Sequence, residues 1–122
     1  MEIRVVRDRI TRKELKELAE AWNRNSVKAV VDVDQEIMAV GGELHADEEV
    51  LLTEQEGSKR EYAWGINLYP DESGDEFIEF DSMINLKPHL GNRSRGVDDA
   101  AIREKIRKIV GKLVKNNGSP VS

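Results

Sequence analysis

The densest supply of side chains able to recognise a ligand lies between residues 81 and 96, and it ends in a loop bounded by Gly91 and Gly96. Arginine guanidinium groups and the free N–H groups of a helix N-terminus all donate hydrogen bonds to anions, and a helix is predicted directly after this loop. The candidate ligand-binding residues of the loop are Asn92, Arg93, Ser94 and Arg95. We therefore predict that the loop holds a phosphate or carboxylate group.

Three further candidate ligand-binding residues, Asn67, Asp81 and Asn85, are predicted to share one face of a β-hairpin, because alternate residues of a strand point the same way. A second interpretation needs no ligand: Arg93 and Arg95 would pair with carboxylates of the sheet, Asp81 among them, and fix the loop in place. The sequence does not separate the two. It contains neither the Gly-Lys-Ser/Thr end of a Walker loop nor a G-x-G-x-x-G fingerprint.

Other kinds of catalytic or metal site have weaker support. Glu43, His45 and Asp47 could offer a nitrogen and carboxylates to a metal ion. Asp47 is better explained as a helix cap and His45 as a strand residue, so we expect no metal and no cofactor. A Ser/His/Asp arrangement could use Ser82 or Ser94, but no G-x-S-x-G nucleophile elbow is present. The chain has no cysteine, which excludes disulfides, thiolate nucleophiles and cysteine-based metal centres.

Charge is unevenly distributed along the chain. The net charge is −5, yet residues 93–122 carry eight Lys and Arg residues against three acidic ones. A basic helix that faces solvent or packs on an acidic sheet explains this pattern more simply than a nucleic-acid patch does. The basic segment also lacks interleaved aromatic side chains, so nucleic acid is not the favoured partner.

Length and composition indicate one small domain. A chain of 122 residues leaves no room for two independent cores, and we expect a single α+β domain over residues 1–117 followed by a flexible tail over 118–122. No apolar run approaches the roughly 18 to 20 residues that span a bilayer, and the N-terminus lacks a signal peptide. We therefore expect a cytoplasmic protein without membrane contact. Its many charged residues are also typical of thermophile proteins.

The elements that must position the candidate residues can be placed from hydrophobic spacing and capping signals. A Thr11–Glu14 capping box begins a helix that extends to about Trp22. The other expected features are a strand over 3–6, a hairpin of strands 27–33 and 37–40, a glycine bulge at 41–42, a short helix over 47–52, a mobile loop over 55–60, a hairpin of strands 64–69 and 77–86, and a helix capped by Asp98.

Assembled, these elements predict an antiparallel sheet of four or five strands, with the N-terminal and C-terminal helices packed on one face in two layers. The other face would be open to solvent, to a ligand or to a second copy of the chain.

Four stretches resemble a small prokaryotic family of domains of unknown function, number 5674. They are AVGGELHAD over 39–47, WGINLYP over 64–70, FDSMIN over 80–85 and GNRS over 91–94. The resemblance covers nearly the whole chain and supports a single domain. It implies no activity, cofactor or catalytic residue.

Three function classes stay open at this point. The first is a small binding domain that recognises an anionic ligand (a phosphate, a nucleotide or a nucleic-acid backbone) through the 92–95 loop. The second is a phosphoryl-transfer or hydrolytic enzyme that uses the same loop, with Asp81 or Glu43 as base or metal ligand. The third is a homodimeric or partner-binding domain whose open sheet face is the interface. Replacing Arg93 and Arg95 with Ala distinguishes the three classes. It should abolish ligand binding in the first and turnover in the second, and it should affect only the stability of the fold in the third.

Overall fold

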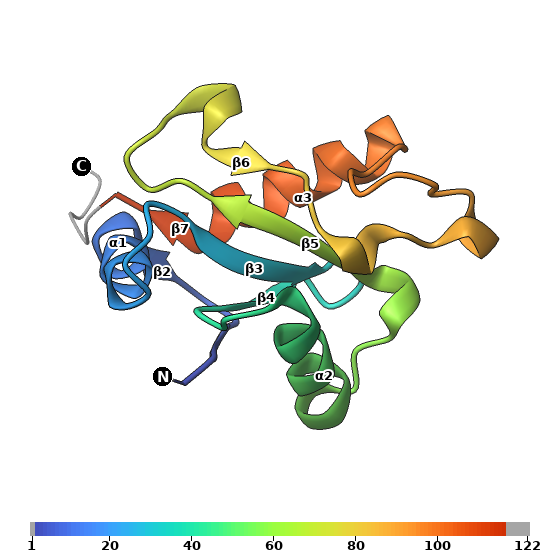
Figure 1. Cartoon of the computed structure of the whole chain (residues 1–122), viewed down its shortest axis with the longest axis horizontal. Coiled ribbons are helices and arrows are strands. Elements are labelled where there is room, and N and C mark those ends of the chain that lie inside the picture. Colours follow the sequence, from blue (N-terminus) through green and yellow to red (C-terminus); the bar gives the residue numbers. More distant parts are fainter. Residues whose placement is uncertain (1, 117–122) are drawn as a thin grey trace.

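The computed structural model describes residues 2–116, so the predicted tail over 118–122 lies outside the described residues. A five-stranded antiparallel sheet in the order β1-β4-β3-β5-β6 forms the centre of the molecule (Figure 1). The strands are β1 Arg4–Val6, β3 Val27–Asp32, β4 Ile37–Val40, β5 Ala63–Leu68 and β6 Ile78–Glu79. The helices are α1 Arg12–Ala21, α2 His45–Glu56 and α3 Ala100–Leu113. The predicted α+β class is confirmed.

Short elements complete the chain. A small parallel pair joins β2, Ile10–Thr11, to β7, Val114–Lys115, and so connects the two ends of the described chain. Four 3-10 turns lie in the connections: η1 Arg60–Tyr62, η2 Gly74–Glu76, η3 Met83–Asn85 and η4 Pro88–Leu90. Within residues 2–116, none of the helices combines the length and apolar character needed to cross a membrane.

Helices α1 and α3 cover one face of the sheet, as the sequence predicts. Side chains at alternate positions of β3 enter the main hydrophobic core there, together with Leu15 of α1 and Ile106 of α3, both of which are fully buried. The capping box is also confirmed, because the Thr11 side chain accepts from the Glu14 N–H and Glu14 accepts from the Thr11 N–H. The N-terminal helix therefore begins where its local sequence indicates.

The opposite face, which the sequence leaves open, is partly covered by α2. Leu52 of α2 packs on a second core cluster with Val30, Ala39 and Ala63. Small side chains at these sheet positions let the helix approach closely, and periodicity alone does not show which face a short helix will cover. The covered area is no longer available to the interface that a homodimer of the predicted kind would use.

Three predictions for the segments around α2 are wrong: the start of the helix, the glycine bulge and the mobile loop. The helix begins at His45 with Leu44 at the N-cap, so Asp47 is not its cap and His45 is not a strand residue. Gly41 and Gly42 follow the end of β4 instead of forming a bulge inside it. The predicted mobile loop is held in place, since α2 continues to Glu56 and the buried Ser58 hydroxyl donates to Asp32 Oδ2 at 2.6 Å.

The predicted strand over 77–86 is also wrong beyond residue 79. β6 contains only Ile78 and Glu79, and the chain then turns through η3. The Ser82 hydroxyl accepts from the Ile84 N–H, which starts a turn where the alternating pattern predicts extended backbone. Likewise, Asp99 caps α3 by accepting from the Ala101 N–H, and the predicted cap Asp98 has other partners.

Candidate functional site

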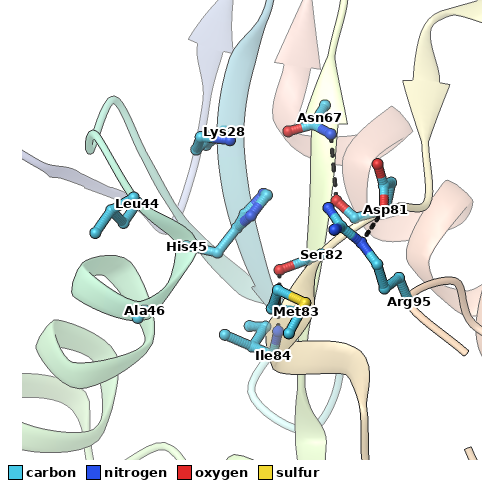
Figure 2. A pocket seen from close by; sticks show the side chains of 10 residues that line it. All are labelled: Lys28, Leu44, His45, Ala46, Asn67, Asp81, Ser82, Met83, Ile84 and Arg95. Carbon is cyan, nitrogen blue, oxygen red and sulfur yellow. Dashed lines mark hydrogen bonds and ion pairs between the residues drawn. The ribbon is translucent and has the colours of Figure 1, made fainter. Parts of the chain in front are cut away.

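A cleft of about 250 Å³ lies on the α2 side of the sheet. Figure 2 shows that its side chains come from the first turn of α2, from strands β3 and β5, and from the segment after β6. The lining residues are Lys28, Leu44, His45, Ala46, Asn67, Asp81, Ser82, Met83, Ile84 and Arg95. Three of the seven predicted ligand-binding residues, Asn67, Asp81 and Arg95, are therefore brought together.

Strand pairing places Lys28 and Asn67 side by side, because β3 and β5 align these two residues opposite each other. Asn67 is held by its neighbours: its Nδ2 donates to Glu79 Oε1 at 2.9 Å and to the Asp81 carbonyl at 3.3 Å. Lys28 is half-buried and forms no ion pair with any residue between 2 and 116. The cleft thus contains one fixed amide and one cation without a carboxylate partner in the described chain.

Arg95 supplies a second cation from the loop before α3. Its Nε donates to Asp81 Oδ1 at 2.7 Å, and both side chains are about half exposed (Figure 2). This is the arginine–carboxylate pair that the ligand-free interpretation expects. The contact uses only Nε, and a guanidinium group has four further N–H donors on its two terminal nitrogens. Arg95 can therefore hold Asp81 and still donate to a ligand.

The N-terminus of α2 opens at the same cleft. Leu44, His45 and Ala46 line it, and no side chain caps the helix. His45 Nε2 lies 2.8 Å from the Ile66 carbonyl. Because a carbonyl only accepts, Nε2 must carry the hydrogen, which leaves a lone pair on Nδ1. Burial lowers the pKa of the imidazole, and the positive charges of Lys28 and Arg95 act in the same direction.

Asn85 lies behind the cleft and is completely buried. Its side chain accepts from the Gly65 N–H at 2.7 Å and donates to the Gly65 and Arg95 carbonyls, each at 2.9 Å. The carboxamide thus takes the place of a β6 residue opposite Gly65, beyond the point where β6 ends. A Cβ on Gly65 would lie 2.5 Å from the Ser82 side chain, so the glycine is what allows this segment to pack on β5.

Asn92 organises the following loop from within. Its amide donates to the carbonyls of Asn85, Ser94 and Gly96, and its Oδ1 accepts from the Asp98 N–H. Ser94 donates its hydroxyl to Asp98 Oδ1 at 2.6 Å. Asn92, Arg93 and Ser94 do not line the cleft, and neither does Asn85. The seven predicted residues therefore divide into three at the cleft and four elsewhere.

Sequence reasoning missed Lys28 and the role of His45. Lys28 lies in an apolar strand, and only the β3–β5 register brings it opposite Asn67. His45 would have needed the correct start of α2, for which no capping side chain gives a signal. Glu43, His45 and Asp47 do not form a metal site: the structure, across the residues it describes, has no group of three or more His, Cys, Asp or Glu side chains placed to bind a metal ion.

Comparison with models of known protein families finds a match. A family model described as "Protein of unknown function (DUF5674)" matches residues 4–113, which include every strand of the main sheet and all residues of the cleft. No curated protein and no solved structure matches the chain.

Proposed function

This chain belongs to the DUF5674 family of proteins of unknown function, and we propose that it binds a small anionic ligand, one that carries a phosphate or carboxylate group, in the cleft between α2 and β5. The observation that carries the proposal is the convergence of Lys28, Arg95 and the uncapped N-terminus of α2 on one cleft. All three favour negative charge, and the helix N-terminus and arginine also give directed hydrogen bonds.

The acidic residues near the cleft do not cancel these donors. Asp81 is the carboxylate that lines it, and Arg95 pairs with Asp81 through Nε alone. Glu48 lies in the first turn of α2, and burial raises the pKa of its carboxyl group well above the ordinary value, which favours the uncharged form. The neutral imidazole of His45 adds no charge, and its Nδ1 is an acceptor that suits a ligand hydroxyl.

A titration with inorganic phosphate and pyrophosphate, followed by 1H–15N NMR, tests the proposal. We expect the amide resonances of residues 44–47 to shift. Replacing Lys28 or Arg95 with Ala should weaken binding by about tenfold or more, because a hydrogen bond to a charged group contributes about 1.5 to 3 kcal/mol. Asp81→Asn should strengthen binding, since it removes the one negative charge in the cleft.

Arg93→Ala is the matched control, because Arg93 lies in the same loop and outside the cleft. It should leave phosphate affinity within about twofold of the wild type. Equal losses for Arg93→Ala and Arg95→Ala would mean that the anion is attracted only by net charge. Unchanged amide resonances at residues 44–47 would place any bound anion elsewhere and refute the proposal.

A hydrolytic or phosphoryl-transfer reaction in the same cleft is the second candidate. One observation favours it: His45 is buried, neutral and close to the cations Lys28 and Arg95. A general base that acts on a substrate with a phosphate group needs these properties. Turnover of p-nitrophenyl phosphate that His45→Gln abolishes, while phosphate affinity is retained, would support an enzyme. If the wild type binds phosphate without turnover, the enzyme candidate is excluded and the binding-domain proposal stands.

A further inference from the structure

A second and larger cavity, of about 410 Å³, lies between the start of β5, the η4 turn and the first turns of α3. It shares no lining residue with the anion cleft. The η4 turn lies in the segment between β6 and α3, two elements that Figure 1 labels. A volume of this size falls in the range of sites for small organic molecules, about 300 to 1,000 Å³.

Two aromatic side chains form one wall of this cavity. Tyr62 is the last residue of η1 and Trp64 is the second residue of β5, and both line the cavity. Trp64 is buried, whereas two other lining residues stay partly open to solvent: Tyr62 is 38% exposed and Leu90 is 47% exposed. Large apolar side chains that stay exposed around a cavity are typical of binding surfaces.

The rim of the cavity is predominantly acidic. Glu61, Asp98 and Asp99 line it, against the single cation Lys105. Asp98 accepts from the Ser94 hydroxyl and the Arg93 N–H, and these bonds lower its pKa and keep it ionised. Glu61 forms no ion pair within the described part of the chain.

We propose that this cavity binds a small organic cation, an ammonium group that carries apolar substituents. Aromatic faces attract such cations while their apolar surfaces accept the substituents, and carboxylates at the rim complement the charge. Lys87 already lies over the Trp64 ring, with Nζ 5.2 Å from its centroid, but Lys87 donates to the Ile84 carbonyl and does not line the cavity. Tyr62 is therefore the ring most accessible to a ligand.

The first experiment compares choline with its neutral isostere 3,3-dimethylbutan-1-ol, in which carbon replaces the charged nitrogen. The indole N–H resonance of Trp64 is followed by NMR in the wild-type protein, and that of Trp22, whose Nε1 donates to the Gly41 carbonyl, is the internal control. We expect choline to shift Trp64 and not Trp22, with an affinity about tenfold above that of the isostere. Equal affinities, or no shift of Trp64, would overturn the proposal.

The second experiment removes one rim charge. Glu61→Gln should weaken choline binding about threefold or more and leave the isostere unaffected, because only the cation interacts with that charge. Glu54→Gln is the matched control, since Glu54 is an exposed glutamate on α2 outside the cavity. If Glu61→Gln weakens both ligands equally, or if Glu54→Gln weakens choline as much as Glu61→Gln, the carboxylate does not recognise the cation and the proposal fails.

Discussion

Replacing Asn85 with Ala should destabilise the protein more than any substitution of an exposed residue. The Asn85 side chain makes three hydrogen bonds to backbone groups, and it is completely buried. Its removal leaves the Gly65 N–H and carbonyl without partners, whereas the Arg95 carbonyl still accepts from the Ser82 N–H. Each buried group that loses its partner costs about 1 to 3 kcal/mol, so we expect a loss of about 3 to 4 kcal/mol in the free energy of unfolding.

Urea unfolding followed by circular dichroism measures this loss, with an unchanged m-value showing that the unfolding transition is comparable. The melting temperature should fall by about 12 to 16 °C. Asn85→Asp separates hydrogen bonding from lost volume. It keeps the size and the acceptor for Gly65 N–H but places a carboxylate oxygen against two carbonyls, so it should be at least as destabilising.

Asn25→Ala is the matched control, because Asn25 is exposed and its side chain forms no hydrogen bond within residues 2–116. It should change stability by no more than about 0.5 kcal/mol. A loss below about 1 kcal/mol for Asn85→Ala would refute the reasoning, since it would mean that water replaces the amide at no cost.

Two further substitutions test the surroundings of the anion cleft. Gly65→Ala places a Cβ 2.5 Å from Ser82 and should lower the free energy of unfolding by about 2 kcal/mol or more, as measured by thermal unfolding. Gly111→Ala is the control: its Cβ would meet nothing within 4 Å inside α3, so it should stabilise the protein by up to about 1 kcal/mol. Equal effects of the two substitutions would contradict this explanation. Glu48→Gln should remove a pH dependence. Because the native pKa of Glu48 is raised above the usual 4.5, the contribution of this residue to wild-type stability is fully present below pH 4.5 and is lost as pH rises, by up to about 1.4 kcal/mol per unit, until the native pKa is passed. In urea unfolding from pH 4 to 9, the free energy of unfolding of the Gln variant should therefore increase relative to that of the wild type as pH rises. A constant difference between the two free energies would show that Glu48 is already ionised in the folded protein.

Local signals predicted the parts of the fold that local interactions determine. The capping box of α1, the apolar strands β3 and β5, and the amphipathic α3 all follow from residues close together in the sequence. The segment after β6 could not be predicted in this way. Its alternating pattern indicates a strand, but the side chains of Ser82 and Asn85 bond to backbone groups. Two of these groups, the N–H and the carbonyl of Gly65, lie in another strand.

Sequence reasoning proposed only some of the residues that line the candidate cleft. Two of the proposed residues, Arg95 and Asp81, form an ion pair there. Whether an arginine faces a cleft or solvent depends on the interactions that hold its loop in place. For the loop that contains Arg93 and Arg95, these include the hydrogen bonds that the buried Asn92 side chain donates to backbone carbonyls. The approach of Lys28 and His45 depends on strand register and on helix placement, which are interactions between distant segments.

The pairing of β2 with β7 has a consequence for how the protein is made. A ribosome delivers the chain from its N-terminus, so β2 is synthesised long before its partner residues 114–115. Until then α1, which follows β2 directly, is attached to the growing domain without this contact. Closing a connection between such distant segments is slow, because the intervening chain must first be ordered. Until residues 114–115 are synthesised, the backbone groups of β2 therefore lack the strand partner that they have in the folded domain.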